Sequence, residues 1–254
     1  MGADDPREPG CRWVVLASPG MDIILIPGLW LTARSWDGIV PRLEEAGHTT
    51  HALTLPGMES DDADRSGVTR QQHVDAVVSA IDAVPDDAKV LLVGHSMGGV
   101  LAWAAAAARL DRVAGVVFLA SEPGIPEQSD SMFPVDGDDV PLPAWDFFDD
   151  EMVEDLDGDL RDRIRAGSVP SPVHAVTDGL SFESDALHDL PVTMVTAEYD
   201  QAQLKAWTDA GESGTEEIAQ LRNVVWVDLN SGHWPQFSRI DDTSRVLLEA
   251  AARV

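Results

Sequence analysis

The sequence predicts one α/β domain in which helices cover both faces of a mainly parallel sheet. Short apolar and β-branched runs alternate with longer segments of helical periodicity, which is the pattern of parallel strands joined by helices. A chain of 254 residues often forms one α/β domain. The composition, 44% hydrophobic and 24% charged, is typical of a chain that buries a core.

The expected strands come from the apolar runs, and the expected helices from the segments between them. The first two strands flank Ser18-Pro19-Gly20, a turn signal that suggests a hairpin. The predicted strands are residues 12–17, 22–26, 49–55, 89–93, 113–120, 191–197 and 223–229. The predicted helices are residues 35–46, 69–84, 97–109 and about 238–253, with one or two more between the last two strands.

Residues 121–190 differ in character from the rest of the chain. They contain many prolines, few β-branched runs, and 19 acidic against 3 basic residues. We therefore expect residues 1–120 and 191–254 to form the α/β core, and residues 121–190 to form a small inserted cap. An insertion after the strand at 113–120 would emerge at the carboxyl edge of the sheet, where such folds place their sites.

The charge balance excludes several classes of partner. With 17 basic and 45 acidic residues, the formal charge is −28, which repels nucleic acid and anionic lipid. No apolar run is long enough to span a membrane, and no secretory signal is recognisable, so a cytoplasmic protein is expected. Cys11 is the single cysteine, so no cysteine-based metal site can form. Neither a metal nor an organic cofactor is expected.

The strongest local signal for chemistry is the segment Gly94-His95-Ser96-Met97-Gly98-Gly99, between a predicted strand and an alanine-rich helix. This pattern is a nucleophile elbow, in which small residues two positions before and after the serine permit a sharp strand-to-helix turn. Ser96 is therefore the predicted nucleophile. A plain glycine-rich turn is the alternative.

A serine nucleophile needs a base and an orienting carboxylate. His233 lies in a loop after the last predicted strand and is the best candidate for the base; the other histidines, His95 included, are expected to be structural. For the acid, Asp200 follows the strand at 191–197 and is preferred. Glu198 and Glu122, which also follow strand ends, are the rivals.

Two backbone N–H groups are expected to stabilise the developing oxyanion. One belongs to Met97, directly after the nucleophile. The other belongs to Leu29 in the loop Pro27-Gly28-Leu29-Trp30, which follows the strand at 22–26. Trp30 and Trp234 flank these loops, and aromatic residues of the cap are expected either to line a substrate pocket with them or only to anchor the cap on the core: Phe133, Trp145 and Phe148.

The order of Ser96, Asp200 and His233 in an α/β pattern resembles the α/β-hydrolase superfamily over about residues 13–254. The elbow and the short cap look like its cofactor-free esterase, lactonase and perhydrolase-like members. The resemblance implies a triad of these three residues, with Leu29 and Met97 as oxyanion donors. Two positions depart from the common pattern: Pro27 stands where many members have histidine, and Ala197 where relatives often have glycine.

These features predict an acyl hydrolase that forms an acyl-enzyme on Ser96. Acidic surroundings and apolar cap residues favour a neutral, largely apolar carboxylic ester or lactone as its small-molecule substrate. A thioesterase, acyltransferase or perhydrolase with the same triad is one alternative. A ligand receptor built on a hydrolase scaffold, without turnover, is another.

Overall fold

The computed structural model describes residues 20–254, so the predicted strand at 12–17, its hairpin and Cys11 lie outside the described residues. The described part contains a six-stranded sheet in which every pair is parallel, in the order β2-β1-β3-β4-β7-β8. Its strands are β1 (Asp22–Ile26), β2 (Thr49–Ala52), β3 (Val90–His95), β4 (Val113–Leu119), β7 (Val192–Thr196) and β8 (Val224–Asp228). The α/β fold predicted from the sequence is confirmed.

Parallel pairing brings the carboxyl ends of the strands to one edge of the sheet. In the centre, Leu92 of β3 is in register with Ile24 of β1 on one side and Val116 of β4 on the other. All six residues of β3 are buried. A strand covered on both faces has no polar face to alternate with, which is why β3 reads as an apolar run in the sequence.

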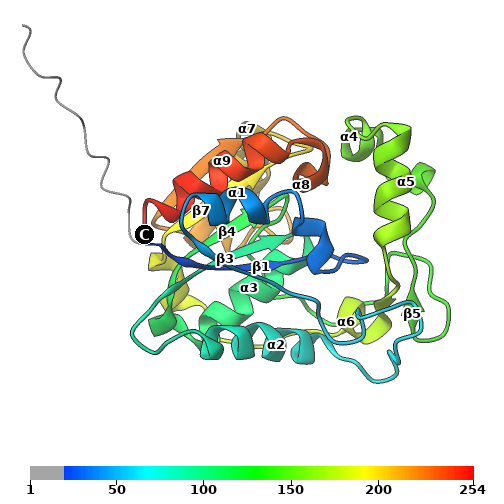
Figure 1. Cartoon of the computed structure of the whole chain (residues 1–254), viewed down its shortest axis with the longest axis horizontal. Helices are drawn as coiled ribbons and strands as arrows, with labels where there is room; N and C mark the ends of the chain where they lie inside the picture. The colour runs from blue at the N-terminus through cyan, green and yellow to red at the C-terminus, as the bar shows by residue number, and fades with distance from the viewer. Residues whose placement is uncertain (1–19) are drawn as a thin grey trace, which may run out of the picture.

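Helices cover both faces of the sheet (Figure 1). Their bounds are α1 (Val40–Glu45), α2 (Arg70–Ala83), α3 (Met97–Ala108), α7 (Gln201–Ala210), α8 (Pro235–Ser238) and α9 (Ile240–Ala251). The helix predicted at 35–46 is instead a 3₁₀ turn, η1 (Ala33–Trp36), followed by α1. Pro41 explains the break, because it lacks an N–H group and fits the first turn of a helix rather than its interior.

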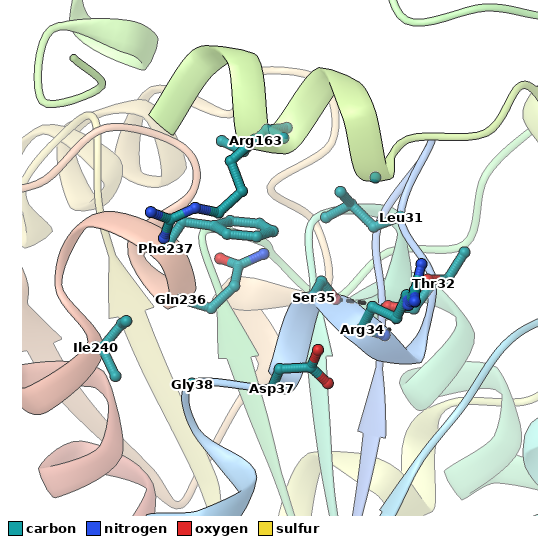
Figure 2. Close-up of a pocket in the computed structure, with 12 residues that line it drawn as sticks. Leu31, Thr32, Arg34, Ser35, Asp37, Gly38, Arg163, Gln236, Phe237 and Ile240 are labelled. Atoms are coloured by element: carbon teal, nitrogen blue, oxygen red, sulfur yellow. Dashed lines mark hydrogen bonds between the residues drawn. The ribbon is translucent and has the colours of Figure 1, made fainter. Parts of the chain in front are cut away.

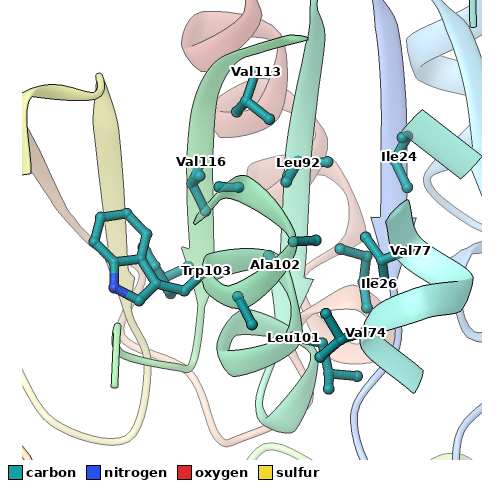
Figure 3. Packing of buried hydrophobic residues seen from close by; sticks show 14 of the residues in the cluster. Ile24, Ile26, Val74, Val77, Leu92, Leu101, Ala102, Trp103, Val113 and Val116 are labelled. Atoms are coloured by element: carbon teal, nitrogen blue, oxygen red, sulfur yellow. The ribbon is translucent and has the colours of Figure 1, made fainter. Parts of the chain in front are cut away.

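Two apolar layers hold the helices to the sheet. In one, α3 packs against the sheet and α2 through residues such as Trp103, Leu101 and Val77 (Figure 3). In the other, Leu247 of α9 and Leu43 of α1 pack against β-strand residues such as Leu25. The core therefore fixes the strand ends, and with them the loops that leave the carboxyl edge.

The chain between β4 and β7, residues 121–190, is called the cap segment below. It contains β5 (Asp139–Val140), η3 (Trp145–Phe147), α4 (Asp150–Val153), α5 (Gly158–Gly167), β6 (Ser171–Pro172), α6 (Val173–Thr177) and η4 (Asp185–Asp189). β5 and β6 form a separate two-stranded antiparallel sheet. In Figure 1, α4 and α5 stand beside the core at one end of the molecule.

The cap segment is tied to the core partly by two buried arginines. Arg65 donates to the carbonyl oxygen of Pro170 at 2.8 Å, and Arg70 donates to the carbonyl oxygens of Ala175, at 2.9 Å, and Val176. Both guanidinium groups are buried, so each bond replaces a water contact that folding removed. Across residues 20–254, no helix is long and apolar enough to cross a membrane.

Candidate active site

Ser96 lies in the sharp turn between β3 and α3, with φ +52° and ψ −126°. Residues other than glycine rarely adopt this backbone conformation, and at Ser96 it is stabilised by the surrounding contacts. The Ser96 N–H donates to the Leu119 carbonyl at 3.1 Å, and the Ser121 hydroxyl donates to the Ser96 carbonyl at 2.6 Å. Ser121, which the sequence reasoning missed, therefore holds the elbow from the end of β4.

The glycines of the elbow are required by close backbone contacts. A Cβ atom at Gly94 would lie 2.4 Å from the Gly99 nitrogen, and one at Gly98 would lie 2.4 Å from the Ile26 carbonyl oxygen. Both distances are shorter than any real Cβ contact, so only glycine fits. The crowding at Gly98 also shows that the elbow packs directly on the end of β1.

Ser96, His233 and Glu198 form one hydrogen-bonded chain. The Nε2 atom of His233 lies 2.9 Å from the Ser96 Oγ, and its Nδ1 lies 2.8 Å from the Glu198 Oε1. A carboxylate accepts hydrogen bonds only, so Nδ1 carries the proton and Nε2 is free to accept one from the serine hydroxyl. His233 and Glu198 side chains are each 15% exposed.

Asp200, the acid preferred from the sequence, makes no hydrogen bond or ion pair with His233. Its carboxylate accepts a bond from the Gln203 N–H at 2.8 Å and caps the first turn of α7. Aspartate is a favoured residue at that position, because its side chain satisfies an N–H group that the helix cannot. The carboxylate that reaches His233 is instead that of Glu198, one of the two rivals named from the sequence, which lies two residues closer to the end of β7.

The carboxyl groups around His233 have opposite electrostatic behaviour. Burial opposes ionisation of Glu198, but its hydrogen bond and charge interaction with His233 outweigh that cost, so its pKa is lowered. Burial raises the pKa of Glu122 to about 7, and the negative charge of Glu198 raises it as well, against the effect of His233. Glu122 thus holds its proton more tightly than Glu198 does.

His95 connects the elbow to the loop of His233. Its Nε2 lies 2.7 Å from the His233 carbonyl oxygen, and because that oxygen can only accept, Nε2–H is the donor. Complete burial, followed by the charge of His233, lowers the pKa of His95 to about 3, so it is neutral near pH 7. His95 thus bonds the backbone of the His233 loop, a contact that only the fold reveals.

The loop after β1 lies against the elbow. A Cβ at Gly28 would lie 2.9 Å from the Ser96 Cβ, so this loop passes directly beside the serine. The N–H groups of the predicted oxyanion donors, Leu29 and Met97, make no hydrogen bond to another residue in the part of the chain that the structure describes. Met97 directly follows Ser96 and Leu29 directly follows Gly28, and free N–H donors are what a developing oxyanion needs.

An aromatic cluster lies on the cap side of these loops. The Trp234 ring is 5.1 Å from the His233 ring and 5.3 Å from Phe148, and Trp30 is 4.8 Å from Phe133. Trp145 lies 5.6 Å from Trp234. The five aromatic residues predicted to line a pocket are therefore brought together, packed mainly on one another. Three of them are buried in the cluster: Trp30, Phe148 and Trp234.

A cavity of about 230 Å³ lies next to this cluster, between η1, α5 and the helices α8 and α9. Figure 2 shows Arg163 reaching from α5 toward Phe237 and Gln236, with Leu31 on the opposite side. Neither Ser96 nor any of the five predicted pocket residues lines it. Among residues 20–254, no group of three or more His, Cys, Asp or Glu side chains is arranged to hold a metal ion.

Comparison with known proteins assigns the fold to a family. The model of a family described as "Alpha/beta hydrolase family" matches residues 23–246 of the chain. A methylesterase of Arabidopsis has a similar solved structure, with a TM-score of 0.72, coverage of 92% of this chain and 100% of that one, and 18% sequence identity. At that identity the likeness concerns the fold alone.

Curated relatives match the chain over shorter stretches. The pyrethroid hydrolase of Sphingobium wenxiniae is 36% identical over 108 residues, which are 41% of this chain and 38% of that protein. Methylesterase 8 of Arabidopsis thaliana is 32% identical over 99 residues, which are 39% of this chain and 36% of that protein. The chain thus spans less than two fifths of the length of these two relatives.

Proposed function

Because the chain belongs to the alpha/beta hydrolase family, we propose that it is a serine hydrolase of carboxylic esters. The observation that carries this proposal is the hydrogen-bonded chain of Ser96, His233 and Glu198, with distances of 2.9 and 2.8 Å. The relatives named as a methylesterase and a pyrethroid hydrolase support the same class of reaction. A carboxylate bonded to an imidazole, which in turn is bonded to a serine hydroxyl, is the arrangement that activates a serine as a nucleophile.

In the proposed first step, the Ser96 oxygen attacks the ester carbonyl carbon while His233 Nε2 takes the hydroxyl proton. The carbonyl electron pair moves onto oxygen, where the N–H groups of Leu29 and Met97 stabilise the charge. The carbonyl reforms, the bond to the alcohol oxygen breaks, and His233 returns its proton to that oxygen. Water then repeats the sequence on the acyl-enzyme, which releases the acid and restores Ser96. Glu198 stabilises the imidazolium throughout.

We assign the substrate class from the surroundings of Ser96. The aromatic cluster offers apolar surface next to the His233 ring, and the formal charge of −28 disfavours the approach of polyanions. A neutral, largely apolar ester or lactone of modest size fits both features. In this proposal residues 121–190 act as the cap that covers the site.

The test uses a fluorophosphonate probe, which phosphonylates activated serines, followed by a panel of activated esters, lactones and thioesters. We expect one labelled peptide, containing Ser96, and many turnovers per site. Ser96→Ala should abolish labelling, whereas Ser79→Ala, which changes an exposed serine of α2, should not. Labelling that survives Ser96→Ala contradicts the nucleophile, and a single slow acylation without turnover favours a receptor. A preference for acyl-CoA over neutral esters of the same acyl chain contradicts the substrate class.

A further inference from the structure

The cap segment holds the backbone of Trp30, the residue next to the oxyanion donor Leu29. The Trp30 N–H donates to the Ser171 hydroxyl oxygen at 2.8 Å, and the Trp30 carbonyl accepts from the Val169 N–H at 2.9 Å. The indole Nε1 donates to the Val140 carbonyl at 3.0 Å. All three partners belong to residues 121–190, more than 100 residues away in the chain.

Trp30 needs such support because its φ angle is +64°. A residue with a Cβ atom is unfavourable in this left-handed region, and it stays there only where its surroundings fix it. Trp30 is also buried, with 4% of its surface exposed, so no solvent replaces a lost partner. If the bonds from the cap segment were removed, the strain would favour a different path for the loop.

The conformation of Trp30 bears directly on Leu29. The Leu29 carbonyl and the Trp30 N–H belong to one rigid peptide unit, because the peptide bond is planar. Fixing the Trp30 N–H therefore fixes one of the two peptide planes that flank the Leu29 α-carbon. The other plane is held by Gly28, which packs beside Ser96. Together they set the direction of the Leu29 N–H.

Ser171 is well placed to act as a fixed acceptor. It is 1% exposed and lies in β6, in register with Val140 of β5. The same small sheet thus presents the hydroxyl to the Trp30 backbone and the Val140 carbonyl to the Trp30 indole. The backbone N–H and the indole N–H of Trp30 thus bond to two acceptors that lie opposite each other in one small sheet.

We propose that Ser171 is a positioning residue of the cap segment, which aims the Leu29 N–H at the oxyanion through its bond to Trp30. This inference rests on the proposed function. Because an oxyanion donor acts in the transition state, loss of its aim should lower kcat and leave KM nearly unchanged. Deleting such a donor lowers kcat by about 10² to 10³-fold, so a misdirected one should cost about 10 to 100-fold.

The experiment compares Ser171→Ala with Ser244→Ala. Ser244 is also buried and its hydroxyl also bonds the backbone, but it donates to the Ile240 carbonyl at 2.7 Å and lies in α9, away from Trp30. Measured for each variant are kcat and KM on p-nitrophenyl butyrate, the rate of phosphonylation by a fluorophosphonate, and Tm. Phosphonylation builds negative charge on the same oxygen position, so it reports on the oxyanion hole independently of turnover. Active sites are counted by the label, so that misfolded protein does not lower kcat.

For Ser171→Ala we expect kcat and the phosphonylation rate to fall together by about 10 to 100-fold, with KM within about twofold. For Ser244→Ala, kcat, KM and the phosphonylation rate should each stay within about twofold of wild type. Ser171→Thr, which keeps the hydroxyl, should recover most of the loss. Ser171→Cys, nearly isosteric but a weaker acceptor, should lose activity as alanine does, so the test does not depend on the folding of one variant.

A fall in kcat no larger than that of Ser244→Ala, or a loss that appears only in KM, would overturn the positioning role. So would a Ser171→Cys variant with wild-type rates. A wild-type protein that is neither labelled at Ser96 nor active on esters would overturn the proposed function and this inference with it. A labelled, active wild type with an unaffected Ser171→Ala variant would overturn this inference alone.

Discussion

The core and the cap segment hold the candidate site in different ways. In the core, Ser96 is fixed by its own turn, by two glycines with no room for a Cβ, and by backbone bonds at the end of β3 and β4. The cap segment instead holds its neighbours through long-range bonds: Ser171 binds Trp30, and the Met152 carbonyl accepts the His233 N–H at 2.8 Å. Ser96 thus depends mainly on its own turn and on the ends of the neighbouring strands β1 and β4, with one bond from Ser121 at the start of the cap segment, while Trp30 and His233 depend on bonds from deeper in that segment.

The largest effect should come from the core, at the acid. Glu198→Gln leaves a side chain of similar shape but favours the wrong tautomer of His233, so kcat should fall about 10⁴-fold. Asp200→Asn is the matched control, because asparagine also caps a helix, and it should keep activity within about twofold. Steady-state kinetics of both variants on p-nitrophenyl butyrate measures the two effects. A large loss in Asp200→Asn with a mild one in Glu198→Gln would return the role to Asp200.

A second, smaller effect tests the contact between the cap segment and the base. A Cβ at Gly232 would lie 2.4 Å from the Met152 carbonyl oxygen and 2.5 Å from Asp155 Oδ1. Gly232→Ala should therefore push the cap segment away from His233, lower kcat about 10 to 100-fold, and destabilise the fold by about 1–3 kcal/mol.

Gly158→Ala is the control for this change, because Gly158 also lies in the cap segment and a Cβ there would meet nothing within 4 Å. Kinetics and thermal unfolding of both variants should separate the effect of the contact from that of an added methyl group. If the two variants behave alike, the contact between α4 and the His233 loop has no role in catalysis.

The last effect is on stability alone and concerns Glu122, which lies where the core passes into the cap segment. Its pKa of about 7 exceeds the ordinary 4.5, so the folded state binds this proton more tightly than the unfolded state between those values. Glu122 therefore contributes stability that is complete below about pH 4.5 and is lost as the pH rises through about 7. The loss amounts to at most about 3 kcal/mol.

Urea unfolding at pH 5 and pH 8 measures this loss. Glu122→Gln should reduce the difference in unfolding free energy between the two pH values, whereas Glu127→Gln, an exposed change nearby, should leave it as in wild type. An unchanged pH dependence in Glu122→Gln would show that the group titrates near its ordinary pKa.

The sequence predicted the parts of the site whose physical cause is local. Gly94, Gly98 and the strand before Ser96 mark the elbow, since a tight turn requires small residues at fixed spacing. The choice between Glu198 and Asp200 was missed because it depends on where β7 ends, and a shift of two residues decides which carboxylate reaches the histidine. Ser171 carries no local signal at all, because its partner Trp30 lies 141 residues away.

The left-handed backbone at Ser96 also limits which nucleophiles mutation can supply at this position. Threonine would add a methyl group to the Cβ, which already has the Gly28 backbone against it, and its branched side chain suits a φ of +52° even less well. Cysteine keeps an unbranched Cβ and exchanges one atom. Of the two other side chains that carry a nucleophilic group on Cβ, cysteine therefore fits position 96 with less strain than threonine, and it would place a thiol beside His233.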